Sequence, residues 1–345
     1  MSMNTVRIGI VGAGSTTIGR QIPYFQKIKD VEIVGISNRS LKSGTKVARD
    51  FNIPKVFESW DELIISPDID AVYIGTWPYL HHSVTIEALK NGKHVLTQAR
   101  MAMNATEAKE MLEVSRRFPE LVTQVFPATR SFTVDHVISQ MIADRYLGDL
   151  LSFNLSDNAG MFDGVPPYTW RHDRELSGDN VMALGYWFEI INRWLGDASS
   201  IFAVTKTNLP TRHDAHGKPR ITDIPDHVEV IAEFVCGAVA HIRISDVMGF
   251  GPRSQAWFFG SEGTLMLDLL TMDLFGGRRG EEGLDKIPVS GSEYGGIGCS
   301  PEQEFIDAIR GVGKVKFNSF EVGVKYMELI EAVKLSSDTG RAVQL

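Results

Sequence analysis

The stretch Val6–Arg20, VRIGIVGAGSTTIGR, constrains the fold of this 345-residue chain more than any other. An apolar run, predicted as a strand, leads directly into the turn Gly12–Gly14, and apolar residues at helical spacing follow it. A strand, a glycine-rich turn and a helix in this order form the first half of a βαβ unit that binds a dinucleotide. Gly12 permits the tight turn, Gly14 lets a pyrophosphate approach the backbone, and the helix N-terminus offers free N–H groups to phosphate.

The turn departs from the G-x-G-x-x-G pattern, because Thr17 stands where the third glycine is expected. Hydroxyl groups can donate to phosphate in its place, so we expect Ser15, Thr16 and Thr17 to contact the nucleotide. A glycine-rich turn without a nucleotide is the alternative interpretation. Predicted strands and helices alternate up to about residue 125, which favours the nucleotide site and predicts a parallel sheet covered on both faces.

Composition and charge narrow the class of protein. With 43% hydrophobic and 23% charged residues, the chain has the composition and length of two globular domains, which we predict at 1–125 and 126–345. The net charge of −8, without Lys/Arg-rich runs, argues against nucleic acid and anionic membranes as partners. The two cysteines lack metal-ligand spacing, so we expect no metal site and reduced thiols in a cytoplasmic protein. A strand that starts near Val6 leaves no room for a signal peptide.

The pattern changes after about residue 125. Helices are predicted at Phe132–Arg145 and Gly178–Leu195, and short apolar runs between and after them predict a large, mostly antiparallel open sheet. The polar stretch Arg212–Pro225 is predicted as a surface loop. The predicted fold class is therefore α/β, with an N-terminal doubly wound parallel sheet and a C-terminal α/β domain.

Several motifs, in their order and spacing, resemble the Gfo/Idh/MocA family of NAD(P)-dependent oxidoreductases. The segment Ile74–His81, IGTWPYLH, is similar to the family's strand-then-TP…H motif, and Gly92–Leu96 is similar to its GKHVL. Trp170–Asp173 and Phe259–Leu265 resemble landmarks of its second domain. The resemblance implies a Rossmann cofactor domain, hydride transfer on a sugar, polyol or related small alcohol, and a homodimer or homotetramer paired through the open sheet.

The resemblance fails at the positions where family members usually carry catalysis. Ala99 occupies the lysine position of the family's EKP motif. Ala183, Trp187 and Ile190 occupy the positions of its Asp, His and Asp, which share one helical face. That face is apolar here, so a helix that only packs into a core becomes a serious alternative.

Nearby polar residues are candidates for the missing chemistry, and we predict three as catalytic. Arg100 is a poor base but can anchor a carboxylate or a developing oxyanion, unless it is only a surface arginine. His172 is the best remaining titratable group, with a solvent-facing loop histidine as the alternative. Asn180 can bond a substrate or cap a helix. The predicted substrate-binding residues are Tyr168, Trp170, Arg171, Asp173 and Tyr186.

The end of the second predicted strand bears on the choice of cofactor. An acid there would bind the ribose of NAD, but the segment reads Ser37–Ser40, SNRS, so Arg39 favours the 2′-phosphate of NADP, with NAD possible. An exposed arginine in a turn is the alternative. The family resemblance places His81 near the cofactor. The other predicted cofactor contacts are Gly12, Gly14, Ser15, Thr16, Thr17, Ser37, Asn38, Thr76, Trp77, Pro78 and Gln98.

Three interpretations of the function remain at this point. The first is an NAD(P)-dependent oxidoreductase acting on a small-molecule alcohol. In the second, the missing Lys, Asp and His mark a ligand sensor or regulatory protein that kept the cofactor fold and lost hydride transfer. The third uses the cofactor for an elimination or epimerisation through transient oxidation. The polar cluster around His172 favours an enzyme.

Overall fold

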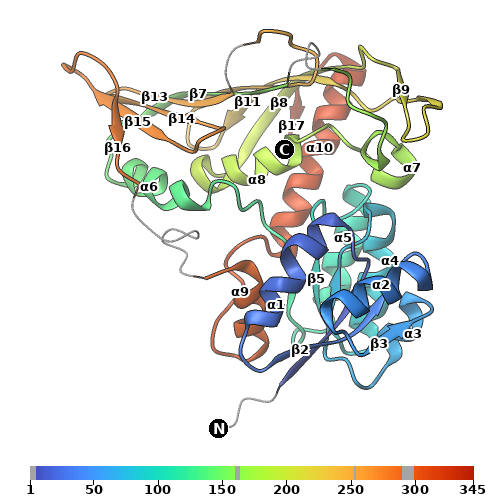
Figure 1. Ribbon diagram of the computed structural model, residues 1–345. Helices are drawn as coiled ribbons and strands as arrows, with labels where there is room; N and C mark the ends of the chain where they lie inside the picture. The colour runs from blue at the N-terminus through green and yellow to red at the C-terminus, as the bar shows by residue number, and fades with distance from the viewer. Residues whose placement is uncertain (1–4, 160–163, 252–253, 290–298) are drawn as a thin grey trace. The chain divides into compact units, whose positions relative to one another are not determined.

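Two units, each with its own sheet, make up the computed structural model, which describes residues 5–159, 164–251, 254–289 and 299–345 (Figure 1). The first unit comprises Met1–Pro127 and Cys299–Met327, and the second comprises Ala128–Gly298 and Glu328–Leu345. The segment Cys299–Met327 therefore packs with the first unit, although the second unit precedes it in the chain.

The first unit is built on a six-stranded parallel sheet in the order β3-β2-β1-β4-β5-β6. Its strands are β1 (Val6–Val11), β2 (Val31–Ser37), β3 (Lys55–Phe57), β4 (Ala71–Ile74), β5 (His94–Thr97) and β6 (Thr123–Val125). The strand order reverses between β1 and β4, and ligands of open α/β sheets bind at such a switch point, outside the carboxyl ends of the strands. This topology confirms the predicted doubly wound parallel sheet.

Helices cover both faces of this sheet. Successive residues of β1 point to opposite faces, and the residues on each face pack against a helix. Ile8 and Ile10 belong to one buried cluster with Phe25 of α1, whereas a Cβ on Gly9 would lie 2.7 Å from Leu63 of α3. The helical elements are the π-helical turn η1 (Thr17–Gln21), α1 (Ile22–Lys27), α2 (Leu41–Phe51), α3 (Trp60–Ile65), the 3₁₀ turn η2 (Pro78–Leu80), α4 (His81–Lys90), α5 (Ala105–Ser115) and α9 (Pro301–Ile309).

The second unit is built on a nine-stranded sheet in the order β16-β15-β14-β13-β7-β12-β11-β8-β17. Only the pair β7–β12 is parallel, which confirms the predicted large, mostly antiparallel sheet. The strands are β7 (Leu150–Asn158), β8 (Ala198–Lys206), β11 (His227–Phe234), β12 (Val239–Ser245), β13 (Gln255–Gly260), β14 (Gly263–Asp268), β15 (Leu274–Arg278), β16 (Asp285–Ile287) and β17 (Val343–Gln344).

Helices pack against one face of the nine-stranded sheet, the lower face in Figure 1. Trp194 of α8 (Leu184–Leu195) contacts Phe153 and Phe258 with ring centroids 6.3 and 5.3 Å apart. Ser336 of α10 (Phe320–Thr339) accepts a hydrogen bond from the Ala203 N–H of β8 at 2.9 Å. The helix α6 (Phe132–Ala143) also belongs to this unit.

Two predicted elements differ from the structure. The helix predicted at Gly178–Leu195 begins only at Leu184, because Gly178 and Met182 adopt left-handed φ angles of 69° and 60° that interrupt a helix. A short helix, α7 (Arg174–Ser177), precedes the interruption.

The loop predicted at Arg212–Pro225 contains a hairpin of β9 (Thr211–His213) and β10 (Pro219–Ile221). The side chain of Asp214 accepts two backbone N–H bonds in its turn, and Gly217 supplies a φ of 75°. These turn-forming residues fold the polar segment into a hairpin, although its composition is typical of a loop.

Candidate active site

The glycine-rich turn after β1 is pressed against the end of β4. Gly12 has a φ of 86°, and a Cβ there would lie 2.7 Å from the Thr76 side chain. A Cβ on Gly75 would lie 2.4 Å from both the Gly12 carbonyl and Thr17 Oγ1. By contrast, a Cβ on Gly14 would meet no atom within 4 Å. The turn is thus closed toward the protein and open at Gly14, which is the side a pyrophosphate needs.

The end of β2 joins the same turn. The Gly12 N–H donates to the Ser37 carbonyl at 2.8 Å, and Asn38 Oδ1 accepts from the N–H groups of Ala13 and Arg39 at 3.4 and 3.1 Å. The Arg39 guanidinium lies over the Trp77 ring, 5.8 Å from its centroid. The structure therefore brings the predicted turn, Asn38, Arg39 and Trp77 together at one edge of the sheet.

His81 lies inside the first unit instead of on its surface. It is fully buried, with Nδ1 2.8 Å from the Arg100 carbonyl and Nε2 3.0 Å from the Thr76 carbonyl. Burial lowers the pKa of its imidazole. The side chain therefore braces the two segments that carry Thr76 and Arg100, and a direct contact with a cofactor would require its exposure.

The segment that includes Arg100 follows β5. The Gln98 N–H donates to the Ile74 carbonyl at 2.9 Å, and the side-chain oxygen of Gln98 accepts from the Ala99 N–H at 3.2 Å. The next residue, Met101, donates its N–H to the Tyr326 hydroxyl. Backbone bonds thus hold Gln98 and Arg100 at the carboxyl edge of the sheet.

In the second unit, His172 closes the 3₁₀ turn η4 (Trp170–His172). Its Nδ1 accepts the Thr169 N–H at 3.0 Å, so a neutral ring carries its proton on Nε2. Burial, and then the charges of Arg212 and Arg171, lower the pKa of His172 to about 4. At neutral pH a neutral His172 can therefore donate a hydrogen bond through Nε2.

The predicted substrate-binding residues around His172 are held by local contacts. The Arg171 guanidinium lies 4.5 Å from the Trp170 ring centroid, and Arg220 of β10 lies 5.2 Å from that of Tyr168. Asn180 Nδ2 donates to the Arg171 carbonyl at 2.8 Å.

The Asp173 and Tyr186 side chains also have partners in the second unit. Asp173 caps α7 by accepting the Glu175 N–H at 3.0 Å. The Tyr186 hydroxyl accepts the Arg130 N–H at 3.0 Å, and burial raises its pKa to about 12. Tyr186 therefore bonds to a different segment from the residues of η4.

The apolar face predicted on α8 is buried in the second unit. Trp187 and Ile190 are 1% and 0% exposed, and Trp187 Nε1 donates to Asp157 Oδ2 at 2.7 Å. Glu189 and Arg193, four residues apart on this helix, form an ion pair with a separation of 2.7 Å. These contacts explain the residues of α8 by packing and pairing alone, so none of them requires a catalytic role.

Sequence reasoning missed Arg212, whose charge acts on His172, and Asp246, on which the same arginine acts. Arg212, on the hairpin predicted as a loop, is 2% exposed, and Asp246 follows β12. Arg212 is close enough to both His172 and Asp246 that its charge acts on their pKa values. No local signal marks Arg212 as buried, because its neighbours on β9 are exposed.

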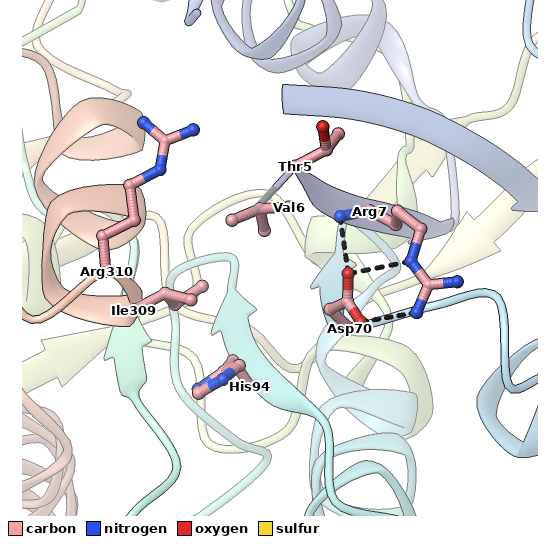
Figure 2. Close-up of a pocket in the computed structure, with 7 residues that line it drawn as sticks. All are labelled: Thr5, Val6, Arg7, Asp70, His94, Ile309 and Arg310. Atoms are coloured by element: carbon pink, nitrogen blue, oxygen red, sulfur yellow. Dashed lines mark hydrogen bonds and ion pairs between the residues drawn. The ribbon is translucent and has the colours of Figure 1, made fainter. Parts of the chain in front are cut away.

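A cavity of about 480 Å³ opens at the other end of the first unit's sheet (Figure 2). It lies at the amino ends of the strands, away from Gly12, so it is not the expected dinucleotide site. Arg7 and Asp70 in its wall satisfy one another through three bonds of 2.7–3.0 Å. The lining residues are Thr5, Val6, Arg7, Asp70, His94, Ile309 and Arg310.

Among the described residues, no group of three or more His, Cys, Asp or Glu side chains is arranged to hold a metal ion. Over the same residues, no helix combines the length and the apolar character that crossing a bilayer requires.

Comparison with known proteins identifies two matching family models. The model of the oxidoreductase family with an NAD-binding Rossmann fold matches residues 6–125, and that of the GFO/IDH/MocA C-terminal domain matches residues 136–266. A solved structure of levoglucosan dehydrogenase with NADH and levoglucosan has a TM-score of 0.84 at 20% identity, covering 98% of this chain and 99% of that one.

Curated relatives are dehydrogenases and reductases by name. Trans-1,2-dihydrobenzene-1,2-diol dehydrogenase of Xenopus laevis is 26% identical over 240 residues, which are 69% of this chain and 67% of the relative. The 1,5-anhydro-D-fructose reductase of Ensifer adhaerens is 30% identical over 181 residues, 51% of this chain and 52% of the relative. The alignments thus span about half to two thirds of these relatives. With both family models matched in order, and with the fold they imply, the chain belongs to the Gfo/Idh/MocA family of oxidoreductases.

Proposed function

We propose that this protein is a nicotinamide-dinucleotide-dependent dehydrogenase acting on a sugar, a polyol or a related diol. The observation that carries the proposal is the turn at the switch point of the sheet, closed by Gly12 and Gly75 and open at Gly14. Relatives named for a dihydrodiol and an anhydro sugar support an alcohol substrate with neighbouring hydroxyl groups. The dinucleotide, when bound, supplies the hydride acceptor or donor.

We assign the cofactor as NADP, with NAD as the alternative. Arg39 is exposed and stacked near Trp77, where its charge can meet a 2′-phosphate, and no acid stands at the end of β2 to bind a free ribose. Ser15, Thr16 and the N–H groups around Gly14 would hold the pyrophosphate. Thr17 supports the turn from inside the protein: its side chain is 1% exposed, and its hydroxyl donates a hydrogen bond to the Gly12 carbonyl.

Three polar residues keep proposed roles toward the substrate. Arg100 stabilises negative charge on the substrate, since a guanidinium stays protonated. His172 donates its Nε2–H to a substrate oxygen. Asn180 acts as a positioning residue through its bond to the Arg171 carbonyl. In this scheme the substrate site is lined by Trp170, Arg171 and Tyr168. Tyr186 and Asp173 stabilise the segments that carry this lining.

The two predicted domains are assigned different tasks. We propose that residues 1–125 bind the cofactor and that residues 126–345 bind the substrate and assemble the protein. A second copy of the chain would cover the bare face of the nine-stranded sheet, giving a homodimer or a homotetramer. A sensor that binds cofactor without turnover is the second candidate, supported by Ala99, Ala183 and Trp187 at the family's catalytic positions.

A turnover screen separates the enzyme from the sensor. Sugars, polyols, inositols and trans-diols are incubated with NADP⁺ or NAD⁺ at several pH values, and the absorbance of the reduced nicotinamide is followed. We expect turnover with at least one class. Cofactor binding, seen by tryptophan fluorescence, without turnover of any substrate would support the sensor instead.

A glycine variant tests the cofactor site itself. Gly14→Val places a branched side chain where no protein atom lies within 4 Å, so the fold is retained while the pyrophosphate is blocked. Gly19→Val is the matched control, because a Cβ at Gly19 also meets open space. We expect cofactor binding to be lost only in Gly14→Val. A folded Gly14→Val protein that binds cofactor with unchanged affinity would place the phosphate site elsewhere.

A further inference from the structure

A second concave site lies within the first unit, at the amino ends of its parallel strands (Figure 2). It is the cavity of about 480 Å³ described above, and this volume falls in the range of pockets that hold small ligands. Its wall comes from four places: the start of β1, the residue before β4, the start of β5 and the end of α9. All of them belong to the first unit. The site is therefore built by one unit alone, at the opposite end of β1 from the Gly12 turn.

One charged pair in the wall is already complete. Asp70 accepts one hydrogen bond from the Arg7 backbone N–H and two from the Arg7 guanidinium, at 2.7–3.0 Å. Burial by itself would raise the pKa of Asp70, but the hydrogen bonds and the charge of Arg7 outweigh burial and lower it. Both members are therefore ionised at neutral pH, and the pair adds no net charge to the cavity.

A second guanidinium in the wall, that of Arg310, has no carboxylate beside it. Its Nη2 donates to the carbonyls of Lys29 and Asp30, both at 2.7 Å, which ties the end of α9 to the turn before β2. This structural role uses Nη2 alone. The Nε atom is buried without a hydrogen-bond partner, and Nη1 bonds to no residue in the described ranges. Guanidinium N–H groups that lack partners in the wall of a cavity are suited to bind the oxygens of an anion.

His94, at the start of β5, adds a neutral donor to the same wall. Its Nδ1 accepts the Val122 N–H at 2.9 Å, so a neutral ring carries its proton on Nε2. Burial lowers the pKa of His94, and the charges of Asp70 and Glu120 only partly oppose this effect. Within the part of the chain that the structure describes, Nε2 has no hydrogen-bond partner. His94 therefore offers one N–H group to a ligand without adding a positive charge.

The charges of the lining favour a ligand with a single negative charge. Arg7 and Asp70 cancel one another, so the charge of Arg310 is left over. Outside the lining, Lys93 acts on Asp70 and Glu120 acts on His94, and these two outer charges have opposite signs. The sum over the lining and its neighbours is therefore one positive charge.

Apolar side chains form the rest of the wall. Val6 belongs to the buried cluster of the first unit, and Ile309 packs against that cluster from the end of α9. The Thr5 side chain is exposed, so it marks the part of the lining that is open to solvent. A pocket with apolar walls and a few directed donors binds an organic molecule better than a bare inorganic ion.

We propose that this cavity binds a small organic anion that carries one carboxylate group. The carboxylate accepts hydrogen bonds from Arg310 Nη1 and His94 Nε2, and the apolar body of the ligand packs against Val6 and Ile309. The site is separate from the dinucleotide turn at Gly12, and the proposal does not rest on the dehydrogenase function. It adds a ligand that is neither the cofactor nor the alcohol substrate.

The test is a titration of the full chain with para-fluorobenzoate, followed by fluorine NMR. This probe joins one carboxylate to an apolar ring. The matching para-fluorobenzyl alcohol has the ring without the charge, and inorganic phosphate has charge without the ring. We expect para-fluorobenzoate to bind, and the alcohol and phosphate to bind more weakly or not at all.

Variants then locate the bound probe. Arg310→Gln removes the charge and should weaken binding of para-fluorobenzoate about 10-fold or more, and Arg310→Lys should restore part of it. Thr5→Glu adds a negative charge to the lining while the bonds of Arg310 to Lys29 and Asp30 remain, and it should also weaken binding. Arg49→Gln, at an exposed arginine of α2, is the matched control and should bind like the wild type. Gly14→Val should also bind the probe with unchanged affinity.

Each outcome decides for or against this site. Binding that is weakened in both Arg310→Gln and Thr5→Glu but kept in Gly14→Val supports it. If Arg310→Gln fails to fold, judged by thermal unfolding, Thr5→Glu alone decides. Unchanged affinity in the folded variants, or no binding to the wild type at millimolar probe, overturns the proposal. Binding lost only in Gly14→Val would place the probe at the dinucleotide turn, and tighter binding of phosphate or the alcohol would reject the organic carboxylate as the ligand.

Discussion

At the scale of single residues, Arg39 governs the choice between two cofactors. Its guanidinium stands beside Trp77 at the end of β2. We expect NADP(H) to bind more tightly than NAD(H), and Arg39→Ala to weaken NADP(H) binding by about 10- to 100-fold, the worth of one charge-assisted contact. Trp77 offers the fluorescence signal for the titration. Arg49→Ala, an exposed arginine on α2, is the control. Equal affinities of the wild type for NADP(H) and NAD(H), or unchanged NADP(H) binding in Arg39→Ala, would contradict this prediction.

At the scale of elements, a buried ion pair anchors α8. Arg193 bonds to Glu189 at 2.7 Å, to Asp135 at 3.0 Å and to the Ala128 carbonyl at 2.8 Å. Burial, partly offset by Arg193, raises the pKa of Glu189 to about 7. The folded state thus holds a proton that the unfolded chain releases near its ordinary value. The resulting stability is present at low pH and is lost as pH rises through 7.

Glu189→Gln removes this titration, so its free energy of unfolding should fall less than that of the wild type between about pH 5 and pH 8. Urea unfolding at several pH values measures the difference. Glu113→Gln is the matched control, because Glu113 forms an i,i+4 pair with Arg117 that is more than half exposed. A wild type and a Glu189→Gln variant with parallel pH dependences would contradict the prediction.

At the scale of the whole molecule, the sheet face without helices is an expected assembly surface. Phe202 of β8 and Ile231 of β11 pair across the ladder and are 42% and 44% exposed, while Ile201 and Val230 beside them are buried. The two-residue period thus leaves one apolar face open. Val204 of β8 and Val239 of β12 lie on the same face and are also exposed.

Phe202→Asp should split the assembly while leaving the fold intact, because the side chain lies outside the core. Light scattering coupled to gel filtration measures the mass, and the chain alone weighs 38.3 kDa. Ile221→Asp is the control: Ile221 is 84% exposed but lies on β10, in a separate two-stranded sheet. A wild type that already runs at the mass of one chain would refute assembly through this face.

The sequence alone determined the elements whose signals are local. The strand, glycine turn and phosphate-facing helix end lie within about 20 residues, and the spacing of their apolar residues predicts them without distant contacts. The parallel sheet around Val6–Val11, covered by helices on both faces, followed from the same kind of pattern. Arg39 was found in this way too, because it directly follows a strand end.

The tertiary structure alone decided what depends on distant partners. Asp157 reaches Trp187 of α8 only because β7 is held in the sheet by β12, and Arg212 is buried only because a hairpin places it there. His172 lost its expected titration for the same reason, since Arg212 and burial act on its pKa across the fold. Side-chain periodicity is a property of neighbours in sequence, whereas burial and charge environment are set by strand register, which no local pattern specifies.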